Sequence, residues 1–356
     1  MRLPRVVAVV LGGSLLGFVA FLAAGNRASD LIASAPTTTL SPPTTPPPPT
    51  TDTSLSTTTM GATTTTEGRK RLVIHGVGDV NTDTSYIPAL ATEGHEHAWE
   101  GLEGLFIDDD LTVINLECTP SELGTPLDKD FVFRCDPDSL PVMRAFGVDV
   151  VNLANNHSRD HGAEALVDGR ENLESVGIRT VGVGQNRSEA AAPAVVEVGG
   201  WTIAVVGFGG VVPNPGWLAG DDTPGMADGD TIETMVEIVE SAAELADLVI
   251  VTIHWGVELE TEPTPEDRAR AEAIVDAGAD VIFGHHPHRL QPMEEVGGAP
   301  VAWSLGNFVW PNLSVAGSTT AIARVVVEPD RTVTSCLIPA FIVSPGRPEM
   351  TADPEC

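Results

Sequence analysis

The sequence predicts an α/β protein in which central β-sheets are flanked by helices. From residue 71 onwards, short apolar runs of strand length alternate with segments of helical periodicity, as in layered α/β folds. Polar residues recur where those apolar runs end, which is where open α/β sheets bind ligands. The chain before residue 71 has neither pattern, so we expect a membrane anchor and a disordered Thr/Pro stalk to precede the sheets.

The N-terminus has the features of a membrane-targeting segment. Arg2 and Arg5 precede an uncharged apolar run at residues 6–25, which is typical of a signal peptide or a signal anchor. The run is long enough to cross a bilayer. Cleavage after Ala35 would leave Pro36 at the new N-terminus, which is a poor cleavage site. We therefore expect residues 1–34 to be an uncleaved anchor, with a cleaved signal peptide as the alternative.

Residues 35–70 are mostly Thr, Pro and Ser. A segment of this composition cannot build a core, so we expect an extended, partly polyproline-II stalk. At about 3.1 Å per residue, such a stalk would reach up to about 100 Å. The expected location is the cell membrane, with a single span and an extracytoplasmic domain. If the signal were cleaved, the protein would be secreted.

The charge of the chain excludes two classes of partner. There are 19 basic and 50 acidic residues, which gives a formal net charge of -31. An acidic surface of this kind repels nucleic acid and anionic lipid. We therefore expect no nucleic-acid partner, and contact with the membrane through the N-terminal helix only.

The four cysteines contain no CxxC pair, which argues against a zinc site built from thiolates. Outside the cytoplasm, an even number of cysteines permits two disulfides. Pairing Cys118 with Cys135 and Cys336 with Cys356 closes the shortest loops, and it is one of three arrangements. Buried free thiols are the alternative.

Eight apolar runs are predicted as strands, at residues 72–77, 111–116, 148–153, 179–183, 202–207, 248–253, 280–283 and 301–304. Helices are predicted at residues 162–176, at residues 232–246 and from Thr264, which is followed by a first-turn proline and two acids. Residues 321–327 and 332–338 predict a hairpin. We expect one domain at residues 71–312, completed by a C-terminal hairpin and tail at residues 313–356.

Polar segments follow five of these strands and contain five of the nine histidines. They include Asp79, Asn115, Glu117, Asn155, Asn156, His157, His254, His285, His286 and His288. Imidazole and carboxylate groups together suit Mn, Zn or Fe. A carboxylate can bridge two such ions, which can then clamp the attacking and leaving oxygens of a phosphoryl transfer. The set predicts a site for two divalent metal ions.

The motifs GDV, NLE, NLANNHSRDHG, HWGVELETEPTP, AGADVIFGHHPH and SLGNFVW resemble, in this order, those of the CapA or poly-γ-glutamate capsule-synthesis family. That family is itself similar to calcineurin-like metallophosphoesterases. The resemblance covers roughly residues 72–310 and implies a layered, metallophosphoesterase-like fold.

The resemblance also implies a role for each site residue. Asp79 and His288 would bind the first metal ion, Glu117 would bridge, and Asn156, His254 and His286 would bind the second ion. His157 would be the general acid or the group that stabilises a phosphate.

Several neighbouring residues carry weaker expectations. The phosphoesterases have a histidine two residues after the first aspartate, where this chain has Asn81. We expect His285 to hydrogen-bond rather than ligate a metal ion. Asp160 is expected to cap the following helix, and Asn307 to fix a turn beside the site.

The resemblance implies a part in the synthesis, export or anchoring of a poly-γ-glutamate-like capsule. We expect a metal-dependent, phosphoesterase-like hydrolase acting on an anionic envelope polymer or its precursor. The alternative is a non-catalytic component that binds the polymer or scaffolds the capsule export machinery. The nearly complete ligand set favours the hydrolase, whereas Asn81 and a glutamate at the bridge favour the alternative. A third reading is a stalked surface domain with vestigial ligands.

Overall fold

A computed structural model describes residues 68–355 of the chain. These residues belong to one compact unit, residues 63–356. The expected anchor, almost all of the expected stalk and Cys356 lie outside the described residues. Within the described part, no helix has both the length and the apolar character that crossing a membrane requires.

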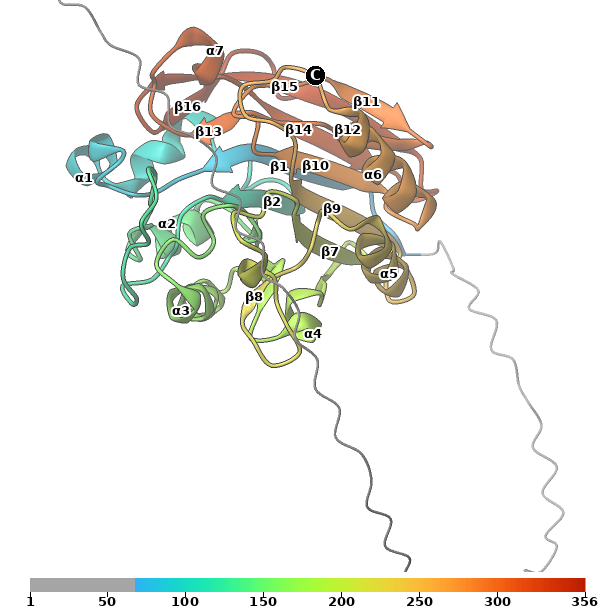
Figure 1. The fold of residues 1–356 in the computed structure, drawn as a ribbon. Coiled ribbons are helices and arrows are strands. Elements are labelled where there is room, and N and C mark those ends of the chain that lie inside the picture. Colours follow the sequence, from blue (N-terminus) through green and yellow to red (C-terminus); the bar gives the residue numbers. More distant parts are fainter. Residues whose placement is uncertain (1–67, 356) are drawn as a thin grey trace, which may run out of the picture. The chain divides into compact units, whose positions relative to one another are not determined.

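The first of two central sheets contains the N-terminal and C-terminal strands of the domain (Figure 1). Its order is β16-β15-β14-β1-β2-β3-β4, with β13 also paired to β1. Strands β1 to β4 run parallel, whereas β14 to β16 are antiparallel to their neighbours. The strands are β1 (Leu72–Val80), β2 (Leu111–Leu116), β3 (Val150–Asn152), β4 (Arg179–Val181), β13 (Asn307–Val309), β14 (Thr319–Val327), β15 (Val333–Ser344) and β16 (Arg347–Met350).

The second sheet has the order β11-β12-β10-β9-β7-β6, with parallel central strands and antiparallel edge strands. Its strands are β6 (Ala194–Val198), β7 (Trp201–Gly209), β9 (Leu248–His254), β10 (Val281–His285), β11 (Met293–Val296) and β12 (Ala299–Ala302). Two further short strands, β5 (Val183–Gly184) and β8 (Gly225–Met226), pair with each other.

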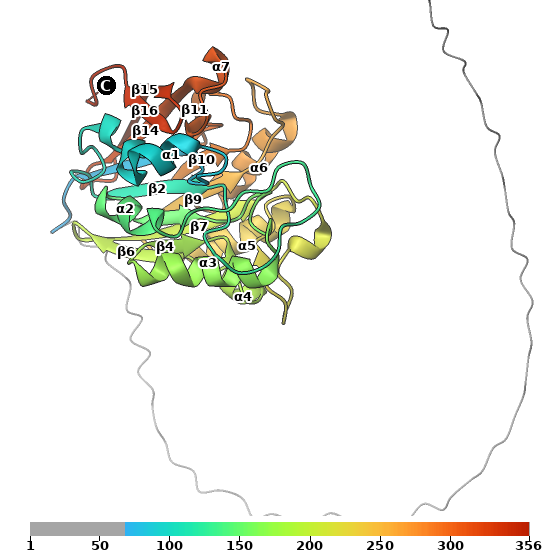
Figure 2. The same cartoon turned by 90° about the vertical axis from the view of Figure 1, so that its left-hand side faces the viewer.

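Helices cover the outer faces of both sheets (Figures 1 and 2). Their bounds are α1 (Pro88–Glu93), α2 (Ser139–Ala145), α3 (Ala163–Ser175), α4 (Arg187–Ala190), α5 (Ile232–Ala243), α6 (Pro265–Asp276) and α7 (Val315–Ser318). Short 3-10 helices lie at η1 (His95–Ala98), η2 (Glu100–Leu102) and η3 (Pro215–Trp217).

The alternation of side chains along each strand builds three apolar layers. In β2, Val113 packs in the cluster between the sheets, together with Val205 of β7. The next residue, Ile114, faces the opposite side and joins the cluster that contains residues of α2 and α3. On the far side of the second sheet, residues of α5 and α6 pack against its strands. The predicted α/β fold, with mixed central sheets flanked by helices, is confirmed.

Each predicted strand run contains a strand, and β14 and β15 form the predicted antiparallel hairpin. The predicted disulfide between Cys118 and Cys135 is present. The second proposed pairing involves Cys356 and therefore stays a prediction. Strand β6 and helix α2 were not predicted from the sequence.

The strand register aligns the polar residues at one end of each sheet. In the first sheet, Asp79 lies beside both Asn115 of β2 and Asn307 of β13, and Asn115 lies beside Asn152 of β3. In the second sheet, His254 lies beside His285. The polar strand ends therefore form two rows, one on each sheet, rather than the edge of a single sheet.

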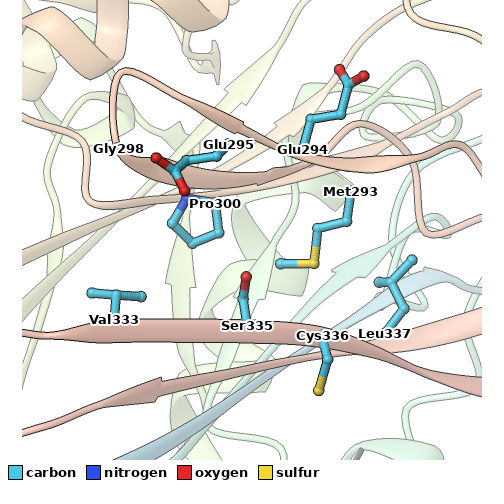
Figure 3. A pocket seen from close by; sticks show the side chains of 9 residues that line it. All are labelled: Met293, Glu294, Glu295, Gly298, Pro300, Val333, Ser335, Cys336 and Leu337. Carbon is cyan, nitrogen blue, oxygen red and sulfur yellow. The ribbon is translucent and has the colours of Figure 1, made fainter.

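A separate cavity of about 390 Å³ lies between β11 and β15 (Figure 3). It is lined by Met293, Glu294, Glu295, Gly298, Pro300, Val333, Ser335, Cys336 and Leu337. It contains none of the predicted metal ligands.

Candidate metal centre

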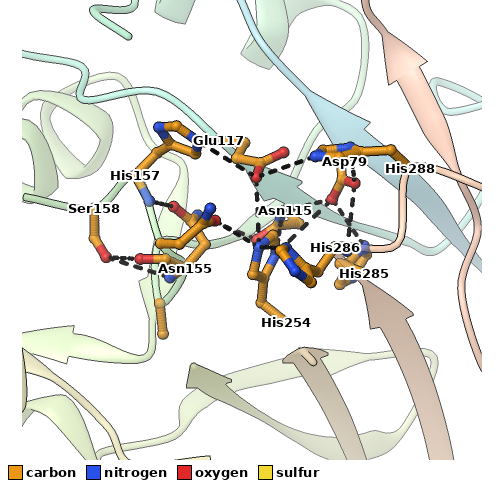
Figure 4. Close-up of polar contacts among 12 residues, drawn as sticks. Asp79, Asn115, Glu117, Asn155, His157, Ser158, His254, His285, His286 and His288 are labelled. Atoms are coloured by element: carbon orange, nitrogen blue, oxygen red, sulfur yellow. Dashed lines mark hydrogen bonds and ion pairs between the residues drawn. The ribbon is translucent and has the colours of Figure 1, made fainter. Parts of the chain in front are cut away.

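The predicted ligands come together where the two polar rows meet (Figure 4). Asp79 comes from β1, and Glu117 follows β2 directly. His254 and His285 end β9 and β10, and His286 and His288 follow on the loop after β10. The structure therefore gathers side chains from both sheets into one buried cluster.

Asp79 is fully buried and surrounded by donors. Its Oδ1 accepts a hydrogen bond from Asn115 Nδ2 at 2.9 Å, and its Oδ2 lies 3.0 Å from His288 Nδ1. Burial opposes ionisation, but the hydrogen bond and charge of His288 outweigh it and lower the pKa of Asp79. Asp79 is therefore an anionic carboxylate in the metal-free cluster.

Glu117 is fully buried, and neither of its carboxylate oxygens accepts a hydrogen bond. Burial, followed by the negative charge of Asp79, raises its pKa well above the usual value. A buried carboxylate without partners is costly, and a bound cation is one of the few groups that satisfies it. The donor set around Glu117 therefore fits a metal ion.

Three potential ligand atoms lie around His254 Nε2. Asn156 Oδ1 lies 2.8 Å away, His286 Nδ1 lies 3.1 Å away, and Glu117 Oε1 lies 3.4 Å away. Burial lowers the pKa of His254 well below its usual value and lowers that of His286 to about 4. Both rings are therefore neutral near pH 7, which is the form that ligates metal ions. This group contains the residues expected at the second metal ion.

His288 lies at the other end of the cluster. Its Nδ1 is 2.8 Å from Asn307 Oδ1 and 3.0 Å from Asp79 Oδ2, whereas its Nε2 is 3.9 Å from Glu117 Oε1. Burial opposes the charge, but Glu117 and Asp79 raise the pKa of His288 to about 9. Without metal, a protonated His288 balances the charge of the anionic Asp79.

Two of these ligand candidates have unusual backbone conformations. His286 has φ 97° and His288 has φ 53°, in the left-handed region that residues other than glycine rarely adopt. Such conformations persist where the surrounding structure requires them, and they cluster at functional sites. The two histidines and Glu117 each place a ligand atom within 4.8 Å of the others.

His157 lies beside the cluster rather than inside it. Its Nδ1 is 2.7 Å from Asp160 Oδ2, and its Nε2 is 4.0 Å from Glu117 Oε1. Asp160 is fully buried and also accepts hydrogen bonds from Lys129 Nζ and from the backbone N–H of Phe133. Burial lowers the pKa of His157.

The expectation that Asp160 caps the next helix is wrong. Helix α3 begins at Ala163, its N-cap is Gly162, and no side chain bonds to that end. The carboxylate of Asp160 is instead used by His157 and by Lys129 from the preceding loop. The contact with Lys129 could not be predicted from a local pattern, because Lys129 is distant in sequence.

His285, Asn81 and Asn307 also lie beside the cluster and are held by hydrogen bonds. His285 Nε2 lies 3.1 Å from Thr252 Oγ1, so His285 does hydrogen-bond, as expected. Asn81 Oδ1 accepts a hydrogen bond from the backbone N–H of Asp83, and its amide nitrogen is buried without a partner. Asn307 contacts His288 directly, and its amide nitrogen donates to Gly317 O.

Asn115 was named in the sequence motif but given no role, and it proves to be central. Its amide nitrogen donates to Asp79 Oδ1 and lies 3.2 Å from His254 Nδ1. Its carbonyl oxygen accepts hydrogen bonds from Asn152 and Asn155. Asn115 thus links the two ligand groups, and its place two residues before Glu117 on a strand was the available signal.

Comparison with known proteins places this site in a family. The family model for the bacterial capsule synthesis protein PGA_cap matches residues 73–312. The PGA biosynthesis protein CapA of Bacillus subtilis (strain 168) is 32% identical over 237 residues, which cover 66% of this chain and 62% of that protein. The capsule biosynthesis protein CapA of Bacillus anthracis is 33% identical over 187 residues, covering 51% of this chain and 45% of that protein.

A probable polyglutamine synthesis accessory protein of Mycobacterium tuberculosis is 33% identical over 211 residues, covering 56% of this chain and 55% of that protein. The aligned part thus spans between 45% and 62% of the length of these relatives. The matched region contains every residue of the cluster described above. The chain therefore belongs to the PGA_cap (CapA) family of bacterial capsule biosynthesis proteins.

Proposed function

We propose that this protein is a metal-dependent, phosphoesterase-like hydrolase that holds two divalent ions in a metallophosphoesterase-like fold. One observation carries the proposal. Glu117 is a buried carboxyl group without hydrogen bonds, and its Oε1 lies 3.4 Å from His254 Nε2 and 3.9 Å from His288 Nε2, within reach of both groups of expected ligands. A bridging carboxylate needs this position in a site for two metal ions.

The ligand assignments follow from the two groups. Asp79 and His288 would hold one ion, and Asn156, His254 and His286 would hold the other. When bound, the ions would supply Lewis-acid stabilisation of the charge that develops on a phosphoryl group. Imidazole, amide and carboxylate donors suit Mn, Zn or Fe.

His157 would act as the general acid. Asp160 accepts the Nδ1 proton and so leaves Nε2 directed toward the cluster, 4.0 Å from Glu117 Oε1. An anionic substrate in the site would favour the protonated ring. His157 would then donate a proton from Nε2 to the leaving oxygen, and Asp160 would stabilise the imidazolium.

The setting of this activity is also a proposal. We place the domain outside the cytoplasm, held by the N-terminal segment of residues 1–34. The disulfide between Cys118 and Cys135 supports an oxidising compartment. The substrate would be an anionic, poly-γ-glutamate-like envelope polymer or its precursor, handled together with the capsule export machinery.

The second candidate is a non-catalytic component that binds the polymer through its metal ions. It is favoured by Asn81, which stands where the phosphoesterases have a metal-binding histidine and whose side-chain oxygen is used by its own turn. Fewer ligands at the first ion would weaken the binding of that ion.

The deciding experiment measures metal content and hydrolysis together on residues 63–356, the compact unit with its own apolar clusters. About two metal ions per chain, with turnover of bis(p-nitrophenyl) phosphate, are expected. His286→Ala should lower both. One ion or none, without turnover in added Mn or Zn, would overturn the hydrolase and favour the binding component.

A further inference from the structure

A cavity of about 230 Å³ opens beside the candidate metal centre and is bordered by both His157 and His288. It is a place where a substrate would reach the cluster. Its other lining residues are Tyr86, Phe131, Phe133, Glu258, Leu259, Arg289, Asn307, Trp310, Pro311, Leu313, Ser314 and Gly317.

The mouth of this cavity is apolar and exposed. Among its lining residues, Phe131 is 60% exposed, Leu259 is 59% exposed and Leu313 is 77% exposed. Val257 and Val315, each two residues from a lining leucine, are also exposed. Three of the eleven large apolar side chains exposed in the described chain therefore line this one cavity. Clusters of this kind mark binding sites.

Leu259 is held in place against its conformational preference. Its φ is 68°, in the left-handed region that is costly for a leucine. Its backbone N–H donates to Pro287 O at 2.8 Å, and Pro287 lies between the ligand candidates His286 and His288. Because the side chain is mostly exposed, burial does not offset this strain. The conformation keeps an apolar group at the opening.

Arg289 supplies a positive charge to the same cavity. It donates one hydrogen bond, from Nη1 to His288 O at 2.7 Å, and forms no ion pair with any described carboxylate. Most of the other arginines in the described part of the chain have an acidic partner, whereas this cavity-lining arginine has none. A guanidinium with free N–H groups is suited to a phosphate or a carboxylate.

Three aromatic residues in the wall of the cavity pack against other rings of the protein. Phe133 packs on His157 with ring centroids 4.4 Å apart, and Tyr86 packs on Phe133 at 4.6 Å. Trp310 packs on His288 at 4.8 Å. These contacts hold the two histidines in place. The exposed apolar surface left for a ligand consists of Leu259, Leu313 and one aromatic side chain, Phe131, and such a surface suits a hydrocarbon chain.

We propose that this cavity binds an anionic amphiphile, with a phosphate head at Arg289 beside the metal centre and an alkyl or prenyl chain across Phe131, Leu259 and Leu313. This inference rests on the proposed function, because it names the substrate class of the same site. The substrate would then be the lipid-linked form of an envelope precursor, rather than the free polymer.

The test is a calorimetric titration of metal-loaded residues 63–356 with octyl phosphate and ethyl phosphate, below the micelle concentration. Octyl phosphate should bind at least about tenfold more tightly, because its chain buries several additional methylene groups. Leu313→Ser and Phe131→Ser should each reduce this ratio. Leu245→Ser is the matched control, since Leu245 is 60% exposed but does not line the cavity, and it should keep the ratio.

Three results would overturn the inference. The first is equal affinity for the two phosphates. The second is binding of glucose 1-phosphate as tight as that of octyl phosphate, which would indicate a sugar site. The third is a Leu313-dependent association with phosphatidylcholine vesicles without octyl phosphate binding, which would make the mouth a membrane contact.

Measurements of alkyl phosphate binding and of phosphodiester turnover test the amphiphile site and the hydrolase activity independently. If octyl phosphate binds with the expected preference but no phosphodiester is hydrolysed, the result supports the amphiphile site and contradicts the hydrolase activity. If bis(p-nitrophenyl) phosphate is hydrolysed but the length of the alkyl chain has no effect on binding of the alkyl phosphates, the result supports the hydrolase activity and contradicts the amphiphile site. Arg289→Met should weaken binding of both alkyl phosphates, because it removes the cation that contacts the shared head group.

Discussion

His157 Nδ1 lies 2.7 Å from Asp160 Oδ2, and both side chains are buried beside the candidate metal centre. The contact fixes which ring nitrogen faces the cluster. Asp160 ligates nothing in the proposed scheme, so it acts through His157. Removing the charge of Asp160 should therefore impair proton transfer and leave metal binding unchanged.

Asp160→Asn is expected to lower kcat by about a hundredfold while leaving about two ions bound, because general acid–base catalysis contributes effects of this size. The pKa of His157 should fall further, since Asp160 raises it in the wild type. A kcat–pH profile with parallel metal analysis checks both expectations. Loss of metal in proportion to activity would instead indicate that Asp160 only supports the fold.

Glu117→Gln should have opposite effects on the metal-free and metal-loaded domain. Without metal, the change removes a buried carboxyl group whose ionised form is opposed by burial and by Asp79, so the free energy of unfolding above neutral pH should rise by about 1 kcal/mol. With metal, the bridge is lost and the stabilisation by added Mn or Zn should shrink. Thermal unfolding with and without chelator measures both. Destabilisation of the metal-free variant would contradict the position assigned to Glu117.

The metal-free domain should be most stable near pH 6.5. The folded protein holds His285 and His286 at pKa values of about 4, below the usual 6.5, so stability is lost as the pH falls from 6.5 towards 4. His288 has a pKa of about 9, so its contribution is complete below 6.5 and is lost as the pH rises through 9.

Urea unfolding in chelator from pH 4.5 to pH 9.5 tests this prediction. His288→Asn should flatten the loss of stability on the alkaline side and leave the acidic side in place. If the alkaline slope is unchanged in that variant, His288 is not protonated in the folded, metal-free domain.

The disulfide between Cys118 and Cys135 closes a loop with a sequence separation of 17, and Cys118 directly follows Glu117. Replacing both cysteines with serine should lower the free energy of unfolding by about 3 kcal/mol, as expected for a loop of this length. Chemical denaturation of the double variant and the wild type under non-reducing conditions gives the difference. An unchanged midpoint would mean that the bridge contributes nothing to the fold.

The sequence was sufficient to locate those candidate ligands whose positions depend on local patterns. Asp79, Glu117 and His286 each follow or end an apolar strand, so the strand pattern also locates the carboxylates and imidazoles. The parallel pairing of β1 with β2, and of β9 with β10, then brings those ends together. Family motifs supplied their order.

The remaining features depend on tertiary contacts. The roles of Asp160 and Asn307 require Lys129 and His288, which come from other loops. Helix α2 was missed because it is short and contains Pro141. The division of the strand ends between two sheets was also not predicted, since each apolar run is compatible with either sheet.

That division has a consequence for the domain as a whole. Asp79 lies on the first sheet and Glu117 directly follows its strand β2, whereas His254 ends β9 of the second sheet and His286 and His288 lie on the loop after β10. Ions bound by these residues would cross-link the two sheets. Separation of the two sheets on unfolding would then be coupled to release of the ions. A chelator would then lower the free energy of unfolding of this domain.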